Sequence, residues 1–188
     1  MNFKEYQGLA RRTQNMELND EKKRNHALLG IGSELAEIIE RCPEDTEYIA
    51  DELGDFLWFI AELCDVAGID MSHFLVVKGV RNGVWSENKE HMEKYGDVVM
   101  RKFASLAIIH MGKILGMGQK VYQGHSLDKE KLEAQLMELI RISSYFAWYV
   151  NENGIEGVMQ HNIDKLVKRY PDGFSEYRSV NREEYIHE

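Results

Sequence analysis

Two short acidic motifs with the same spacing constrain this chain more than any other feature of its sequence. Glu34 and Glu37 form the first pair, and Glu52 and Asp55 form the second. Residues three apart on an α-helix lie on one face, so each pair directs two carboxylates to the same side of a helix. Pro43 lies between the pairs and predicts a break between two helices. If these helices pack as an antiparallel hairpin, the four carboxylates converge on one small volume.

Such a convergence needs a compensating cation. Two unit charges about 5 Å apart repel by roughly 3 kcal/mol at an effective dielectric constant of about 20. Magnesium takes oxygen ligands and shares its coordination sphere between carboxylates, waters and substrate phosphates. The residues beside the two pairs are apolar, which a solvated acidic face would not need: Leu35, Ile38, Ile39, Leu53, Phe56, Leu57 and Phe59. The pairs therefore indicate a magnesium site, or else an ordinary exposed acidic face, where the same spacing is common.

The rest of the sequence favours an all-α fold. The chain has 188 residues and only two prolines, and the period-two alternation typical of strands is absent over any useful length. A chain of this length can bury a core within one domain. We expect a single helical bundle over residues 1–171, followed by a polar C-terminal tail over residues 172–188.

Capping and terminating residues predict where the helices begin and end. Asn2, with Glu5 three residues later, predicts a capping box at the first helix. Gly68 predicts the end of the third helix. The expected helices span residues 2 to about 15, 19 or 20 to 41, 43 to 68, 70 or 72 to 82, 86 to 116 or 118, 128 to 154, and 156 to 169.

Charge and hydropathy exclude several classes of partner. The formal net charge is −9, from 23 basic and 32 acidic residues, and there is no basic run, which argues against nucleic-acid binding. No apolar run approaches the roughly 20 residues of a membrane span, and the N-terminus lacks a signal-peptide core. We therefore expect a cytoplasmic protein without a membrane partner. Cys42 and Cys64 have no CxxC spacing, which favours reduced, structural cysteines.

Two stretches of the chain are similar to each other. Residues 61–70 align with residues 147–156, with a glycine and the following isoleucine in register. This offset places Asp55 opposite Arg141. The similarity indicates either a duplicated helical unit whose second copy lacks the acidic pair, or a chance match between amphipathic helices. The duplicated units would span about residues 20–83 and 100–171.

Four further residues are candidates for contact with a substrate. Trp58 follows Asp55 by three residues, so it can stack on a base near the acidic face or belong to the core. Lys165, Lys168 and Arg169 are spaced three and four apart on the last helix. They can supply cations to a polyphosphate, or form a solvated basic helix end that the helix dipole favours.

The acidic pairs resemble the ExxE and ExxD motifs of the MazG-like all-α nucleoside triphosphate pyrophosphohydrolases. Glu34-Leu-Ala-Glu37 and Glu52-Leu-Gly-Asp55 are separated by fourteen residues. The stretch from Asn162 to Phe174 is similar to the NxxKLxxRYPxGF segment of that family, and the opening FKEYQGLARRT resembles its first helix. The resemblance covers most of the chain except about residues 84–127, which have no counterpart in short members.

The resemblance implies a helical bundle, dimeric or tetrameric, that hydrolyses nucleoside or deoxynucleoside triphosphates to the monophosphate and pyrophosphate. It implies Mg²⁺, with Mn²⁺ as a substitute, on the ligands Glu34, Glu37, Glu52 and Asp55. It also implies contacts to nucleotide phosphate or sugar from Asn162, Lys165 and Arg169. We assign the catalytic base to Glu37. Ser33 stands where members with a fuller EExxE motif have an acid, a departure that concerns the metal number and the rate.

Two other functions fit the same residues. One is a non-catalytic nucleotide-binding or assembly module that keeps the fold and a weakened site. The other is an enzyme for a related substrate, such as a phosphoribosyl nucleotide or dUTP. The base and the sugar depend on the shape of the pocket, which the sequence does not define.

Overall fold

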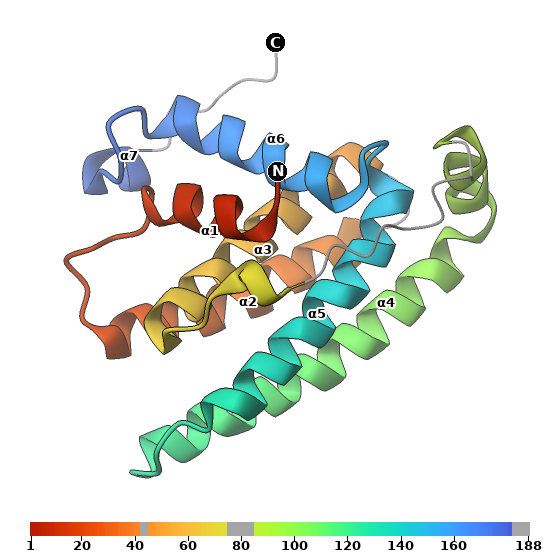
Figure 1. Cartoon of the computed structure of the whole chain (residues 1–188). Coiled ribbons are helices and arrows are strands. Elements are labelled where there is room, and N and C mark those ends of the chain that lie inside the picture. The colour runs from red at the N-terminus through yellow and green to blue at the C-terminus, as the bar shows by residue number, and fades with distance from the viewer. Residues whose placement is uncertain (42–44, 75–84, 182–188) are drawn as a thin grey trace.

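The computed structural model describes the backbone of residues 1–41, 45–74 and 85–181, and their side chains except those of residues 85–89. All regular structure in these ranges is helical, which confirms the all-α prediction (Figure 1). The elements are α1 (Phe3–Arg11), α2 (Asp20–Arg41), α3 (Thr46–Ala67), the 3₁₀ turn η1 (Met71–His73), α4 (Trp85–Tyr122), α5 (Lys129–Val150), α6 (Gly154–Arg169) and α7 (Glu176–Val180).

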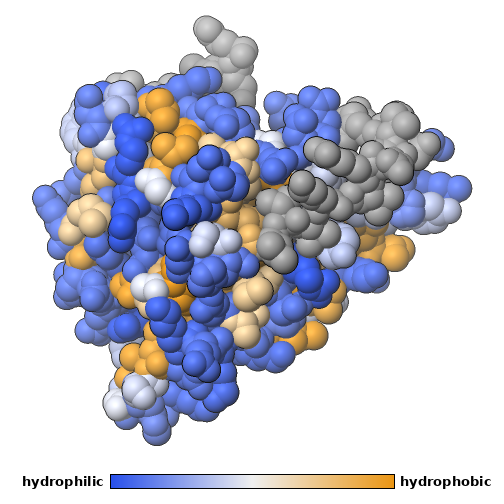
Figure 2. Space-filling model, viewed as in Figure 1, coloured by the Kyte–Doolittle hydropathy of each residue, from blue (hydrophilic) through white to orange (hydrophobic). Residues whose placement is uncertain are grey.

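Helix α3 lies at the centre of the fold. It contacts α1, α2, α5 and α6, and more than half of its residues are buried. Helices α1 and α6 lie on one side of the α2–α3 hairpin, and the long α4–α5 hairpin lies on the other (Figure 1). The apolar residues of these helices form one continuous cluster, whose removal from water is the main stabilising contribution. The face in Figure 2 is largely hydrophilic, with hydrophobic side chains in small separate groups.

Several helix ends follow the capping rules as predicted. Asn2 and Glu5 form a capping box at the start of α1, with both side-chain-to-backbone hydrogen bonds in place. The side chain of Asp128 caps α5 as predicted, whereas α3 begins at Thr46 with Asp45 as its cap, and not at the predicted Pro43. Gly68, with φ of 65°, ends α3 in the left-handed conformation that glycine adopts without strain. These ends are fixed by local chemistry, which is why the sequence alone predicts them.

The predicted end of the helix that begins near Ser86 is wrong. Helix α4 continues through Gly116 and Gly118 to Tyr122, with a kink at Tyr95. A Cβ atom at Gly118 would lie 3.1 Å from a methyl carbon of Leu28, so this glycine allows close packing of α2 rather than ending the helix.

Two other predicted ends differ from the structure. Helix α5 stops at Val150, before the predicted Gly154, and Gly154 instead begins α6 with φ of 58°, against the ring of Trp148. Helix α1 ends at Arg11, four residues before Asn15. Both ends depend on contacts distant in sequence, or on turns that the sequence pattern does not show.

The polar tail contains structure of its own. Helix α7 lies within it, and the backbone N–H of Phe174 donates to the carbonyl of Arg12 at 3.2 Å. Of the predicted helix over residues 70–82, the structure describes the turn η1, capped by Asp70. Residues 75–82 lie outside the described ranges, as do Cys42 and Pro43.

Cys64 is buried and unpaired, in agreement with a reduced cysteine. No helix in the described part of the chain is both long and apolar enough to cross a membrane.

A candidate metal centre between α2 and α3

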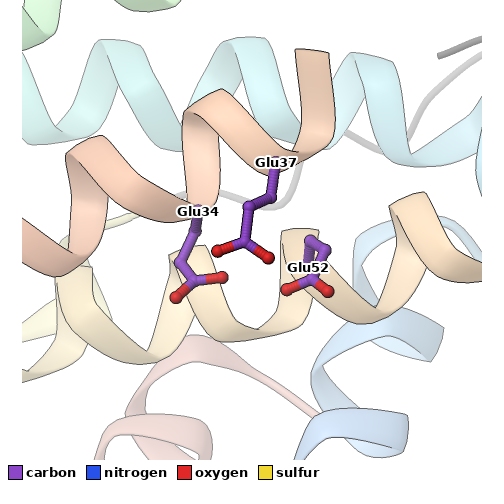
Figure 3. A group of neighbouring side chains, drawn as sticks. All are labelled: Glu34, Glu37 and Glu52. Carbon is purple, nitrogen blue, oxygen red and sulfur yellow. The ribbon is translucent and has the colours of Figure 1, made fainter. Parts of the chain in front are cut away.

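Three of the four predicted carboxylates meet between α2 and α3. Glu34 and Glu37 come from α2, and Glu52 comes from the facing side of α3. Each offers a carboxylate oxygen, and these three atoms lie within 4.8 Å of one another. Figure 3 shows the three side chains directed toward a common point between the two helices. The i, i+3 spacing on α2 and the antiparallel packing of α3 produce this convergence, as the sequence predicted.

The carboxylates are partly desolvated and repel one another. Burial raises the pKa of Glu34 to about 9, with further contributions from its hydrogen bond to Glu52 and from the charges of Asp55, Glu52 and Glu37. Burial also raises the pKa of Glu52, while hydrogen bonds from Glu34 and Tyr48 oppose that rise. These shifts are consistent with a proton held between Glu34 and Glu52 when no cation is bound. A divalent cation would compensate the same charge.

Two hydroxyl groups hold Glu37. Tyr48 donates to one carboxylate oxygen of Glu37 at 3.1 Å, and Ser33 donates to the other at 3.4 Å. Ser33 therefore supplies a hydrogen-bond donor at the position where fuller motifs have an acid. Tyr48 was not predicted as a site residue. It lies four residues before Glu52, and this i, i+4 spacing is the signal that places it on the same face of α3.

Asp55 lies outside the group of three. One of its oxygens accepts from Asn162 Nδ2 at 2.7 Å, and the other contacts Lys165 Nζ at 2.8 Å. Burial raises the pKa of Asp55, and the charge of Lys165 opposes that rise. The charge of Asp55 still acts on Glu34 and Glu52, so it lies near them. Its role as a fourth metal ligand stays a prediction.

Asp55 belongs to a charged network between α3 and α6. Lys165 also contacts Asp51 at 2.8 Å, and His161 Nε2 lies 3.3 Å from the same carboxylate. Asp51 and His161 were not predicted. Each lies four residues before a predicted partner on its own helix, Asp55 on α3 and Lys165 on α6. That spacing is a weak signal, because it does not show that the two helices face each other.

A buried hydrogen-bond network fixes Asn162. The hydroxyl of Tyr6 donates to Asn162 Oδ1 at 2.9 Å and approaches the carbonyl of Gly54 at 3.2 Å. A Cβ atom at Gly54 would lie 2.9 Å from the Cβ of Asn162, so the glycine allows α6 to approach α3 closely. Asn162 thus links α1, α3 and α6 and holds the carboxylate of Asp55. Its predicted contact with the nucleotide is untested.

The remaining predicted substrate residues are Trp58 on α3 and the basic residues Lys168 and Arg169 at the end of α6. Trp58 donates from Nε1 to Thr13 Oγ1 at 2.9 Å and packs edge-on against the rings of His26 and Phe59. The charge of Arg169 lowers the pKa of Asp55, which places its guanidinium near the network. Lys168 is exposed in the last turn of α6. Base stacking by Trp58 and phosphate contact by the two basic residues stay predictions.

The three glutamates fit a hard divalent cation. They present only carboxylate oxygens, the donors that Mg²⁺ and Mn²⁺ accept. Among the described residues, no lysine or arginine forms an ion pair with any of the three. Lys165 is paired with Asp51 and Asp55 instead. Within the described ranges, the negative charge of the three glutamates is therefore not balanced by an ion pair.

The chain matches no family model, no curated protein and no solved structure. The family resemblance therefore depends on the motifs alone, and the function is argued from the geometry of the side chains.

Proposed function

We propose that this protein hydrolyses nucleoside or deoxynucleoside triphosphates to the monophosphate and pyrophosphate, with Mg²⁺ as cofactor and Mn²⁺ as a substitute. The observation that carries the proposal is the convergence of Glu34, Glu37 and Glu52 from two helices, where no lysine or arginine of the described ranges forms an ion pair with them. A triphosphate is itself an anion and is repelled by such a cluster. It can approach only together with a divalent metal, so the site selects a metal–polyphosphate complex.

In this proposal the three glutamates hold the metal. Mg²⁺ held by these carboxylates would polarise the phosphoryl oxygens and lower the pKa of a coordinated water. Glu37 accepts the proton of the attacking water. The hydroxyls of Tyr48 and Ser33 donate to its two oxygens, so its carboxylate is held in one orientation.

The α6 network supplies positive charge beside the metal cluster. Lys165 is held by Asp51 and Asp55, and Arg169 lies close enough to act on Asp55. We propose that Lys165, Lys168 and Arg169 stabilise the negative charge that grows on the departing pyrophosphate. Asn162 keeps Asp55 oriented toward this region, and Trp58 is the candidate for stacking on the base.

A product analysis in labelled water tests the reaction. The purified protein is incubated with each common nucleoside and deoxynucleoside triphosphate in Mg²⁺ and H₂¹⁸O, and the products are separated by ion-exchange chromatography and analysed by mass spectrometry. We expect the monophosphate and pyrophosphate, with ¹⁸O in the monophosphate if water attacks the α-phosphorus. Release of single orthophosphate would contradict the proposal, and EDTA should abolish turnover.

A non-catalytic nucleotide-binding module is the second candidate, and Ser33 favours it. A hydroxyl at this position binds Glu37 but offers no additional carboxylate for a second metal. This alternative predicts Mg²⁺-dependent binding of a triphosphate without turnover. Calorimetric titration with a non-hydrolysable triphosphate analogue, beside the product analysis, separates the two candidates.

A further inference from the structure

A second concave site lies on the α4–α5 hairpin. The hollow has a volume of about 430 Å³, within the range of roughly 300–1,000 Å³ found for small-molecule pockets. None of the metal-site carboxylates lines it. Half of its lining residues are aromatic: Phe103, Tyr145, Phe146, Trp148 and Tyr149.

The aromatic lining offers flat surfaces. The rings of Phe103 and Phe146 stack, with centroids 4.2 Å apart and an interplanar angle of 18°. Tyr145 is about half exposed, and Tyr149 is partly buried, so both rings remain accessible at the edge of the hollow. Rings of this kind bind the face or edge of another planar ring.

The charged residues of the lining are both basic. They are Lys102 on α4 and Arg141 on α5, and no carboxylate of the described residues lines the hollow. Arg141 is paired with Glu138 at 2.7 Å. Lys102 is exposed and forms no ion pair within the described part of the chain. The hollow therefore favours an anion, in contrast to the glutamate cluster between α2 and α3.

Trp148 adds a donor that lacks an acceptor. Its Nε1 atom is buried and has no hydrogen-bond partner among the described residues. Because this atom has almost no accessible surface, a ligand in the hollow contacts the indole ring rather than its N–H group. Since the side chain of Trp148 lines the hollow, its indole signal reports on a ligand bound there.

We propose that this hollow binds a small planar aromatic anion. The ring lies among the aromatic side chains, Trp148 included, and the negative group pairs with Lys102. Mononucleotides and aromatic carboxylates share this chemistry. Binding requires no metal, because the lining residues that the structure describes include no carboxylate that a metal would have to neutralise.

Nuclear magnetic resonance on the indole N–H groups tests this site. The ¹⁵N-labelled full chain is titrated in EDTA with AMP and, separately, with indole-3-acetate. The Trp148→Phe variant identifies the Trp148 signal by its loss. We expect a saturable shift of that signal with at least one anion, while the signal of Trp58 stays in place. A response to AMP alone identifies a nucleotide ligand, and a response to indole-3-acetate alone identifies an aromatic carboxylate.

Variants on one helix provide the control. Lys102→Gln should weaken binding by about tenfold, as expected for loss of a hydrogen bond to a charged group. Lys120→Gln changes an exposed lysine of α4 that does not line the hollow and should leave the affinity unchanged. Adenosine, which lacks the phosphate, should bind more weakly than AMP if the nucleotide binds. The proposal is wrong if neither anion shifts the Trp148 signal saturably, or if Lys102→Gln binds as well as wild type.

Discussion

The two helical hairpins α2–α3 and α4–α5 pack against each other but carry opposite chemistry (Figure 1). The offset that aligns residues 61–70 with 147–156 places Glu52 and Asp55 of α3 opposite Glu138 and Arg141 of α5. On α5 the two side chains form an ion pair with each other at 2.7 Å. On α3 both are acids and cannot pair. The same i, i+3 spacing thus gives an ion pair within α5, whereas on α3 Asp55 is paired with Lys165 of α6 and Glu52 lies in the cluster of three glutamates.

A second pair of positions shows the same divergence. Glu62 on α3 and Trp148 on α5 correspond at this offset, and each has a buried polar atom without a partner among the described residues. In α3 the atom is a carboxylate oxygen, an acceptor. In α5 it is an indole N–H, a donor. Whether the units are duplicated stays a prediction. If they are, both copies retain the helices, but the buried atom without a partner is an acceptor in one copy and a donor in the other.

The largest expected effect is on the rate of hydrolysis, and it distinguishes Glu52 on α3 from Glu138 at the corresponding position of α5. Glu52→Gln removes a carboxylate from the metal cluster and should lower the rate of triphosphate hydrolysis by about 10²-fold or more. Glu138→Gln, the matched variant, should stay within about twofold of wild type, because Glu138 pairs only with Arg141 at the surface. Steady-state assays with one chosen triphosphate and Mg²⁺ measure the hydrolysis rates of both variants.

Stability measurements separate this loss of activity from a loss of fold. Because Glu52→Gln relieves repulsion within the cluster, its free energy of unfolding should equal or exceed that of wild type without metal. Equal rates in the two variants, or full activity in Glu52→Gln, would remove the assignment of the site.

The next effect compares two helical glycines. Gly54→Ala places a Cβ atom 2.9 Å from the Cβ of Asn162, so it should force α3 and α6 apart and lower the free energy of unfolding by about 1–3 kcal/mol. Gly112→Ala on α4 is the control. Its Cβ would meet no atom within 4 Å, and alanine favours a helix, so it should raise stability by about 0.5–1 kcal/mol. Urea unfolding measures both, and a destabilised Gly112→Ala with an unaffected Gly54→Ala would contradict the packing argument.

Features governed by local rules could be predicted from the sequence. The caps at Asn2 and Asp128 and the stop at Gly68 depend on residues within one turn. The meeting of Glu34, Glu37 and Glu52 required only helical periodicity and a hairpin. These predictions succeeded because no distant element had to be placed for them.

The position of Asp55 could not be predicted in this way. The helical period directs it to the same side as Glu52, but Asn162 and Lys165 of α6 engage both its oxygens. These partners are more than a hundred residues away in sequence, and their approach depends on the glycine at position 54. Gly118 is a second example. The sequence predicted that it ends a helix, but in the structure it allows close packing against Leu28. Long-range packing decided both cases.

The smallest expected effect concerns pH. His26 Nδ1 lies 2.7 Å from Glu62 Oε2, and the hydrogen bond to Glu62 raises the pKa of His26 above 6.5 even though burial lowers it. A raised pKa in the folded state stabilises the protein below the unfolded value near 6.5, and that stability is lost as pH rises through the folded value. The His26 side chain is about half exposed, so the contribution should be below about 1 kcal/mol.

A histidine of the α4–α5 hairpin, His110, provides the control for the pH effect at His26. His26→Gln keeps a donor to Glu62 but cannot become charged, so its destabilisation relative to wild type should be larger at pH 6 than at pH 8.5. His110 on α4 contacts the uncharged side chain of Gln135 at 2.9 Å, so its partner provides no ion pair at either pH. Urea unfolding of both variants at the two pH values measures the difference. If His110→Gln shows the same pH dependence as His26→Gln, the effect does not come from the ion pair with Glu62. The two hairpins would then not differ in the pH dependence of their stability.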